Sequence, residues 1–115
     1  MTSNQTEKEF ALYVGEMMQP IGPVQRKFML GVYGLFLDGL MFGLITDNTL
    51  YLKTNKNTEH LFKNKGLETF TYQKKNKAVS LPYFQAPEEI LEEHDAMNEW
   101  ANRSYSKALH ARTKK

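Results

Sequence analysis

The chain has 115 residues, of which 41% are hydrophobic and 24% are charged, a composition typical of one soluble globular domain with its own core. It contains no cysteine, which excludes a disulfide scaffold, thiol catalysis and cysteine-ligated zinc. The net charge of +2 is too small to indicate a polyanionic partner by itself.

The first predicted element is an amphipathic helix near the N-terminus. Thr6 and Glu9 have the spacing of a capping box, which satisfies the free amide groups of a first helical turn. Four apolar residues then follow at the i, i+3, i+4 and i+7 positions of one helical stripe. They are Phe10, Tyr13, Val14 and Met17. Because this region lacks the basic and apolar segments of a secretory signal, we expect a cytoplasmic protein.

Residues 28–46 are almost wholly apolar, but the pair Asp38-Gly39 divides them in the middle. A membrane-spanning helix needs about 20 apolar residues in succession, and an aspartate near its centre costs several kcal/mol. Two shorter strands joined by a tight turn therefore suit this segment better. We expect no contact with a membrane.

Two turn signals predict a meander of three strands in this region. Asp38-Gly39 and Asp47-Asn48 suit two-residue hairpin loops, because both central residues of a type I′ turn have positive φ. Residues 40–46 are then the central strand. Their continuous apolar sequence predicts that this strand is covered on both faces.

Counting back from the first loop pairs Leu37 with Leu40 and places Gly34 opposite Gly43. Two facing glycines leave a thin place in a sheet, which suits the close approach of another element. A packed helix is the commoner occupant of such a place, and a ligand is the rarer one.

The second half of the chain predicts a short helix and another hairpin. Asn55 suits the N-cap of a helix that ends before Gly66. Apolar residues alternate on both sides of the polar segment 74–77, which predicts two strands with these side chains in the core. They are Phe70, Tyr72, Val79, Leu81 and Tyr83. Pro82 cannot donate a ladder hydrogen bond, so we expect it at a strand end or at the sheet edge.

A last helix completes the predicted fold. Asp95 suits its cap, and apolar or small residues recur behind it at helical spacing. They are Met97, Trp100, Ala101, Ser104, Tyr105 and Ala108. The predicted order is α-β-β-β-α-β-β-α, and we expect an α+β fold in which helices pack on an antiparallel sheet. Residues 1–115 are expected to form a single domain.

No group of residues forms a recognised catalytic, cofactor or metal motif. The three histidines are scattered, and the acidic residues between positions 88 and 95 suit a solvated helix better than a cation site. No serine lies in a nucleophile elbow, and no glycine-rich segment ends like a phosphate loop. We therefore expect no enzymatic activity, no cofactor and no metal.

One local excess of basic residues suggests nucleic acid as an alternative partner. Within residues 63–77 five lysines accompany a single acidic residue, and aromatic residues lie between them. The lysines are Lys63, Lys65, Lys74, Lys75 and Lys77. Basic groups next to exposed aromatic rings can bind single strands. However, strand alternation assigns the neighbouring Phe70 and Tyr72 to the core, and solvated surface lysines are the simpler interpretation.

The segment KFMLGVYGLFLDGLMFGLITDNTLYLK resembles the signature of the TfoX N-terminal domain family, which includes the TfoX/Sxy regulators of bacterial competence. The usual signature runs from Met-Phe-Gly-Gly-Tyr-Gly through an aliphatic strand to Asp-Gly, and Leu-Tyr-Leu-Lys follows. The resemblance covers about residues 8–110. Leu30 stands where the signature has Phe, and Val32 stands where it has its second Gly.

The resemblance implies an α+β fold of the secretion-chaperone type, a regulatory or protein-interaction role, and no catalytic residues. Motif residues that match the family are expected to be structural. They are Gly31, Tyr33, Gly34, Asp38, Gly39, Phe42, Tyr51, Lys53 and Trp100. Full-length regulators that this chain resembles carry a second, C-terminal domain, for which we expect no room in 115 residues.

The leading hypothesis is therefore a non-enzymatic protein-interaction module linked to transcriptional regulation. A nucleic-acid-binding accessory protein that uses the lysine-rich hairpin is the first alternative. A small enzyme with an unrecognised site is the second. The sequence does not identify the protein partner, and it leaves a homo-oligomer open.

Overall fold

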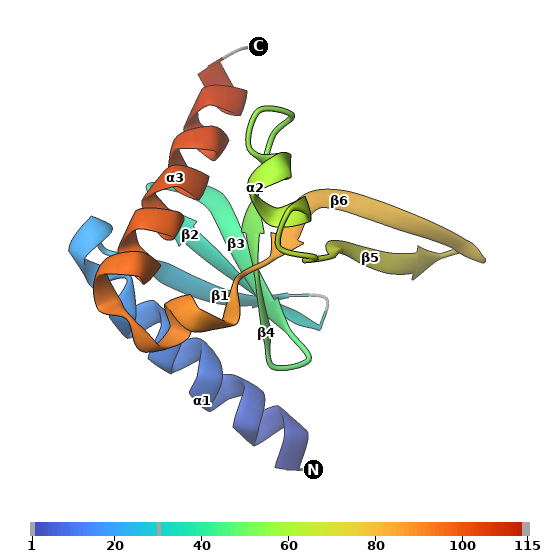
Figure 1. Ribbon diagram of the computed structural model, residues 1–115. Coiled ribbons are helices and arrows are strands. Elements are labelled where there is room, and N and C mark those ends of the chain that lie inside the picture. Colours follow the sequence, from blue (N-terminus) through green and yellow to red (C-terminus); the bar gives the residue numbers. More distant parts are fainter. Residues whose placement is uncertain (1, 30, 114–115) are drawn as a thin grey trace.

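The computed structural model of the chain describes residues 2–29 and 31–113. In this range the strands form one antiparallel sheet in the order β1-β2-β3-β4-β6-β5, and helices pack against one of its faces (Figure 1). The strands are β1 (Gln25–Met29), β2 (Val32–Leu37), β3 (Leu40–Thr46), β4 (Thr49–Lys53), β5 (Thr69–Lys74) and β6 (Lys77–Gln85). The helices are α1 (Thr2–Met17), α2 (Glu59–Lys63) and α3 (His94–Thr113), with 3₁₀ turns η1 (Gln19–Ile21) and η2 (Glu88–Glu92).

The predicted α+β class is confirmed, and every predicted element appears in the predicted order. The structure adds one strand, β1, which lies at the sheet edge and pairs with β2. Its sequence, QRKFM, lacks the alternation of apolar and polar residues that marks a half-buried strand, because most of this edge strand is exposed. The sequence pattern therefore gave no signal for it.

Helix α1 begins at Thr2, so the prediction that Thr6 caps its N-terminus was wrong. Its buried stripe is also rotated from the predicted one. Ala11 and Val14 are fully buried, whereas Tyr13 is 46% exposed. Tyr13 faces η2 instead of the core, and its hydroxyl donates a hydrogen bond to the carbonyl oxygen of Leu91. The buried stripe of α1 therefore runs through Ala11, Val14 and Met17, with Tyr13 outside it.

Three tight turns with positive φ at both central residues shape the sheet, as a type I′ hairpin requires. Two of these turns were predicted, and the third closes the predicted hairpin in segment 74–77. The φ angles are 53° and 80° at Asp38-Gly39, 56° and 56° at Asp47-Asn48, and 50° and 68° at Lys75-Asn76.

The prediction that Gly34 faces Gly43 was wrong by one residue. Leu37 does pair with Leu40, but the register shifts further along, and Gly43 then lies opposite Leu35. A β-bulge in β3 causes this shift, because two residues of β3 oppose one of β2 there. Gly34 therefore faces Leu44, and a side chain added to Gly34 would meet side chains of the sheet instead of a helix.

Strand β6 changes its partners near Pro82. It pairs with β4 from Tyr83 to Gln85, whereas from Lys77 to Ser80 it pairs with β5 alone. Pro82 lies inside β6 and not at a strand end, but it comes directly outside the part of β6 that pairs with β4, where β6 becomes an edge on that side. Its carbonyl accepts from the Thr54 amide, so its missing N–H also faces the β4 side, next to the last β4–β6 pair, Lys53 and Tyr83, where the regular ladder ends. Beyond it, the β5–β6 hairpin projects from the body of the molecule (Figure 1).

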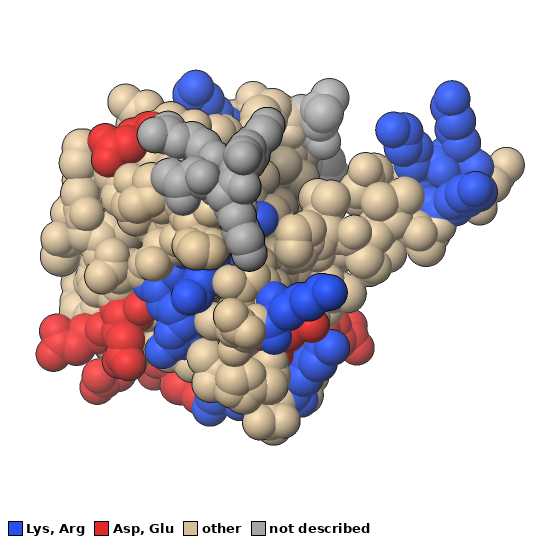
Figure 2. All heavy atoms as spheres, turned by 90° about the horizontal axis from the view of Figure 1, so that it is seen from above, with Lys and Arg blue, Asp and Glu red and all other residues tan. Residues whose placement is uncertain are grey.

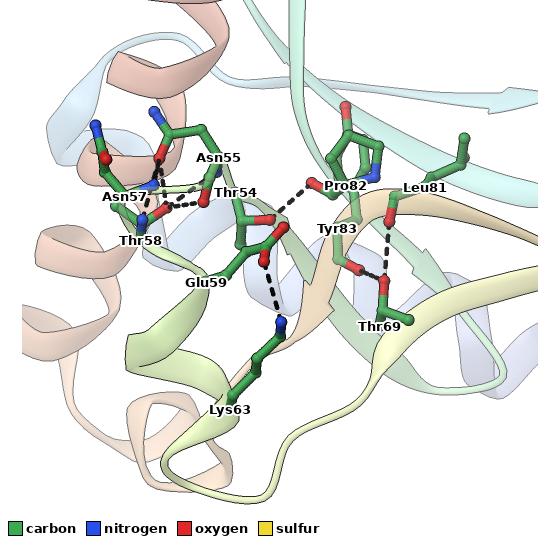
Figure 3. Close-up of polar contacts among 10 residues, drawn as sticks. All are labelled: Thr54, Asn55, Asn57, Thr58, Glu59, Lys63, Thr69, Leu81, Pro82 and Tyr83. Carbon is green, nitrogen blue, oxygen red and sulfur yellow. Dashed lines mark hydrogen bonds and ion pairs between the residues drawn. The ribbon is translucent and has the colours of Figure 1, made fainter.

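Threonine hydroxyl groups hold the base of this hairpin (Figure 3). The Thr54 amide donates to the Pro82 carbonyl at 2.8 Å, and the Thr54 hydroxyl donates to the same oxygen at 3.2 Å. On the other side, Thr69 Oγ1 lies 2.9 Å from the Leu81 carbonyl oxygen and 3.2 Å from that of Tyr83. These bonds satisfy carbonyl groups that the change of strand partner leaves outside the regular ladder.

We expect Gly43→Val to lower the free energy of unfolding by about 1–3 kcal/mol, because it overpacks a rigid place. A Cβ on Gly43 would lie 3.2 Å from the backbone oxygen of Tyr51 and 3.3 Å from Leu35 Cδ1. Gly34→Ala is the matched control. A Cβ on Gly34 would lie 2.8 Å from Phe36 Cε1 and 3.0 Å from Met41 Sδ, so side chains would have to shift there but no backbone atom is among its nearest neighbours. Urea denaturation that finds Gly34→Ala the more destabilising change would contradict this reading of the bulge.

We expect Tyr83→Phe to weaken the loss of stability at alkaline pH. Burial raises the pKa of Tyr83 to about 12 from its usual 10.0, and its hydroxyl donates to the Met41 carbonyl at 3.2 Å. Because the unfolded chain loses this proton first, the contribution of Tyr83 to stability is complete below pH 10 and is lost as the pH rises through about 12.

The variant should be less stable at pH 8 by about 0.5–1.5 kcal/mol, the net worth of a hydrogen bond, and should lose less stability above pH 10. Urea denaturation at several pH values between 8 and 12 checks this. Parallel stability curves for the parent and the variant would show that Tyr83 does not titrate as described.

Candidate functional site

The sheet face opposite the helical layer is here called the open face, and within the described ranges 2–29 and 31–113 only α1 reaches its groove, at one end, through Glu7. Apolar and aromatic side chains of the strands form its surface. They line a groove of about 700 Å³, here called the open-face groove. The apolar residues that line it are Met29, Val32, Met41, Leu44, Tyr51, Phe70, Tyr72 and Leu81.

The prediction that β3 is covered on both faces holds for residues 42–45, which are all buried, while the ends of the strand are half-buried. Phe42 and Ile45 point into the helix-covered core, as expected. Met41 and Leu44 line the open-face groove, although Leu44 is only 2% exposed. The continuous apolar sequence of β3 thus reflects a core on one face and an apolar groove on the other.

Aromatic rings extend the open face onto the projecting hairpin. The rings of Tyr51 and Phe70 pack edge to face with 5.2 Å between their centres. The Phe70 ring stacks on the Tyr72 ring with 6.1 Å between their centres. Tyr72 is 37% exposed, so its predicted place in the core was wrong. Alternation along β5 does put Phe70 and Tyr72 on one face, but the helices do not reach the hairpin to cover that face.

The structure divides the five candidate lysines between two places. Lys63 pairs with Glu59 and Lys65 pairs with Glu89, each at 3.2 Å, next to α2. The other three lie together at the hairpin tip, where they are exposed and where Figure 2 shows a group of basic side chains at the end of the projection. These three, here called the tip lysines, are Lys74, Lys75 and Lys77.

The opposite end of the open-face groove is acidic. Glu7 of α1 and Asp47 of the β3–β4 turn both line it. The Glu7 carboxylate accepts a hydrogen bond from the Asp47 amide, which fixes α1 to this turn. Burial, followed by the charges of Asp47 and Glu68, raises the pKa of Tyr51. The groove is therefore apolar along its length, acidic at one end, and continued by a basic hairpin tip at the other.

Some of the family-motif residues lie on the open face. Gly31 and Tyr51 line the groove, and Lys53 follows Tyr51 on the same face of β4. The Lys53 ammonium group lies 5.3 Å from the centre of the Tyr83 ring, and burial lowers the pKa of Lys53. A partly desolvated cation over an aromatic ring gains a cation–π interaction. Lys53 thus has a packing role at the base of the hairpin.

Most other motif residues hold α3 and the first hairpin in place. The Tyr105 hydroxyl of α3 donates to the Asp38 carboxylate at 3.1 Å, and the Tyr105 ring lies edge to face on Phe42 at 6.2 Å. Trp100 packs in the same way on Phe62 at 5.1 Å. Gly39 has a φ of 80°, a conformation that favours glycine. These contacts join α3 to the first hairpin and to α2.

The remaining motif glycines and Tyr33 lie near the start of β2. Gly31 precedes the strand with a φ of 86°, Tyr33 packs on Phe28 at 4.9 Å between ring centres, and Gly34 is buried. Val32, which replaces the second glycine of the family signature, adds an apolar side chain to the open-face groove. Leu30, the other departure, lies outside the described residues.

Sequence reasoning did not find the groove residues contributed by β1 and β6, Met29 and Leu81. A sheet face is assembled from strands that are distant in sequence, and the strand order that joins them was unknown. One signal was present. The apolar content of β3 exceeded what a single covered face requires.

Within the described residues, no group of three His, Asp or Glu side chains is arranged to hold a metal ion. No helix in this part of the chain is long and apolar enough to cross a membrane.

Comparison with known proteins gives one family. A search of curated proteins returned no match. The model of the TfoX N-terminal domain matches residues 16–108, which include β1 to β6 and most of α3. Since this match covers most of the 115 residues, the chain belongs to the TfoX N-terminal domain family.

Proposed function

We propose that this domain is a non-enzymatic module that acts through protein contacts in transcriptional regulation, and that the open face is its contact surface. Membership of the TfoX N-terminal domain family supports the regulatory role, because the TfoX/Sxy regulators of bacterial competence, which the chain resembles, carry this domain. The single observation that carries the contact surface is an apolar groove of about 700 Å³ on the sheet face opposite the helical layer.

Exposed apolar side chains around the groove support this proposal. Met29 is 38% exposed and Tyr72 is 37% exposed, and both line the groove. Contiguous apolar surface of this kind marks interaction sites in soluble proteins. Methionine and aromatic side chains are well suited to such surfaces, because methionine adapts its shape and aromatic rings supply large contact areas. We place the protein in the cytoplasm, where a regulator of transcription acts.

We expect deletion of the gene in its source bacterium to change the transcript levels of a defined set of genes, as RNA sequencing measures. The parent chain should restore these levels. The double variant Met29→Ser/Tyr72→Ser, here called the groove variant, should not, because it removes apolar contacts from the open face.

The matched control is Leu12→Ser/Leu109→Ser, here called the control variant, which changes two residues of similar exposure, 40% and 38%, outside the groove. Substitutions at such exposed positions are expected to alter stability by about 1 kcal/mol or less, which thermal denaturation should verify. Unchanged transcripts in the deletion strain would refute the regulatory role. Full restoration by the groove variant would refute the open face as the contact surface.

A second candidate function is nucleic-acid binding, and one specific observation favours it. Tyr72 is exposed on the same hairpin as the tip lysines, although the sequence placed it in the core. An exposed aromatic ring next to lysines is an arrangement that binds single strands. The groove's acidic end, with Glu7 and Asp47, opposes the path of a phosphate backbone, so we rank this candidate second.

We expect the parent chain to show no salt-sensitive affinity for labelled single- or double-stranded DNA or RNA, as fluorescence anisotropy measures. The triple variant Lys74→Gln/Lys75→Gln/Lys77→Gln should match the parent in stability within about 0.5 kcal/mol, because all three side chains are exposed. Micromolar binding by the parent would reverse our ranking if the triple variant flattened the slope of log K against log salt by about 3.

A further inference from the structure

The projecting hairpin has an apolar side that nothing in the described residues covers. Phe70 and Tyr72 of β5 and Leu81 of β6 lie on the groove side. Beyond Pro82 the hairpin consists of two strands without a third, because β4 pairs only with residues 83–85 of β6. A two-stranded hairpin is marginally stable alone in water, and its apolar side gains stability by packing on another surface.

Charges at the two ends of this surface are opposite. The tip lysines lie at the end of the hairpin, with Lys74 directly paired with Lys77. No acidic residue occurs between residues 69 and 82 to neutralise them. At the other end of the open-face groove lie Glu7 and Asp47. The surface therefore has a basic end and an acidic end, and between them lie the apolar side chains of the groove and Lys53, whose ammonium group lies over the Tyr83 ring.

This charge order is self-complementary under a two-fold axis. In an isologous dimer each copy presents the same patch to the other. If the axis passes through the middle of the groove, the tip lysines of one copy meet Glu7 and Asp47 of the other. The apolar middle of each open face then packs against its counterpart. These two contacts pair both charged ends of each copy with an opposite charge on the other copy.

We propose that the open face binds a second copy of this chain, with each hairpin lying across the acidic end of the partner copy's groove. This inference rests on the proposed function, because it identifies the protein that binds the contact surface proposed there. The hairpin acts as an arm, and its aromatic side supplies the apolar contact. The tip lysines and the acidic end fix the orientation of the two copies, as complementary charges do at other interfaces.

Two other occupants are disfavoured by the same geometry. A single strand would need free ring faces, but the Tyr51 and Phe70 rings contact each other at 5.2 Å and Phe70 also stacks on Tyr72. It would also run from the tip lysines into the carboxylates of Glu7 and Asp47. A uniformly acidic protein segment would meet the same repulsion at that end. Only an occupant with both charges suits both ends.

Sedimentation equilibrium tests the proposal directly. The parent chain should sediment at twice the 13.4 kDa of one chain at about 100 μM, within the range of a modest interface. The groove variant should sediment as a monomer, because it loses apolar contacts in the middle of the interface. The control variant should remain a dimer. A parent chain that is monomeric at this concentration would overturn the inference.

Charge reversal tests the orientation. A tip variant, Lys74→Glu/Lys75→Glu/Lys77→Glu, and an acidic-end variant, Glu7→Lys/Asp47→Asn, should each dimerise at least about tenfold more weakly than the parent, because like charges then meet at both contacts. When the two variants are mixed, both contacts are matched again, and a mixed dimer should form. Asn is used at position 47 because Asp47 has a φ of 56°, which Asn tolerates.

Circular dichroism should confirm that each variant is folded before it is mixed. A mixture in which both variants stay monomeric would overturn the proposed orientation. Dimerisation by the groove variant with the affinity of the parent would place the interface elsewhere. If the parent chain is monomeric but deletion of its gene still alters transcript levels, the regulatory function is supported and the partner is a different protein. The two proposals can therefore fail separately.

Discussion

One constraint determines the shape of this molecule: β6 is longer than the strand it pairs with. Strand β4 ends at Lys53, and the chain then leaves the sheet toward α2, while β6 continues outward to Lys77. Pro82 marks the point where β6 leaves β4, and Thr54 and Thr69 satisfy the carbonyl groups on either side of it. Everything beyond this point is a hairpin without a covering layer. The exposed aromatic side and the distant tip lysines both follow from that difference in length.

The two faces of the sheet have different roles: one face stabilises the fold, and the other is the proposed contact surface. The helix face holds the core, with Leu35, Phe42 and Leu52 fully buried beneath α1 and α3. Burial of this kind is the main source of folding free energy. The open face carries apolar side chains that the fold does not need to cover. A variant such as Tyr72→Ser therefore alters the surface offered to a partner with little effect on the core, which makes the two roles experimentally separable.

The local parts of the fold were predictable because their causes are local. Asp38-Gly39 and Asp47-Asn48 have positive φ angles, and Asp, Asn and Gly are the residue types that adopt such angles most readily. The bulge that moved Gly43 opposite Leu35 lies inside the strand pair, away from the turn residues that set the register, and no residue spacing reveals it. Tyr72 illustrates the same limit at the site. The alternation of residues along β5 correctly placed Tyr72 on the same face as Phe70. Which face of a strand the helices cover depends on the whole fold, so alternation alone does not predict burial.

The free length of the hairpin also has a consequence for how such domains diversify. Past Pro82 no other strand depends on the register of β5 and β6, so this segment can change length while the rest of the sheet keeps its hydrogen bonds. Adding one residue to each strand would turn every side chain of the tip to the other side, because strand side chains alternate. Adding two to each would keep their orientation and carry the tip lysines outward by about 7 Å. Evolution can therefore adjust the reach of this arm in discrete steps, without altering the core that supports it.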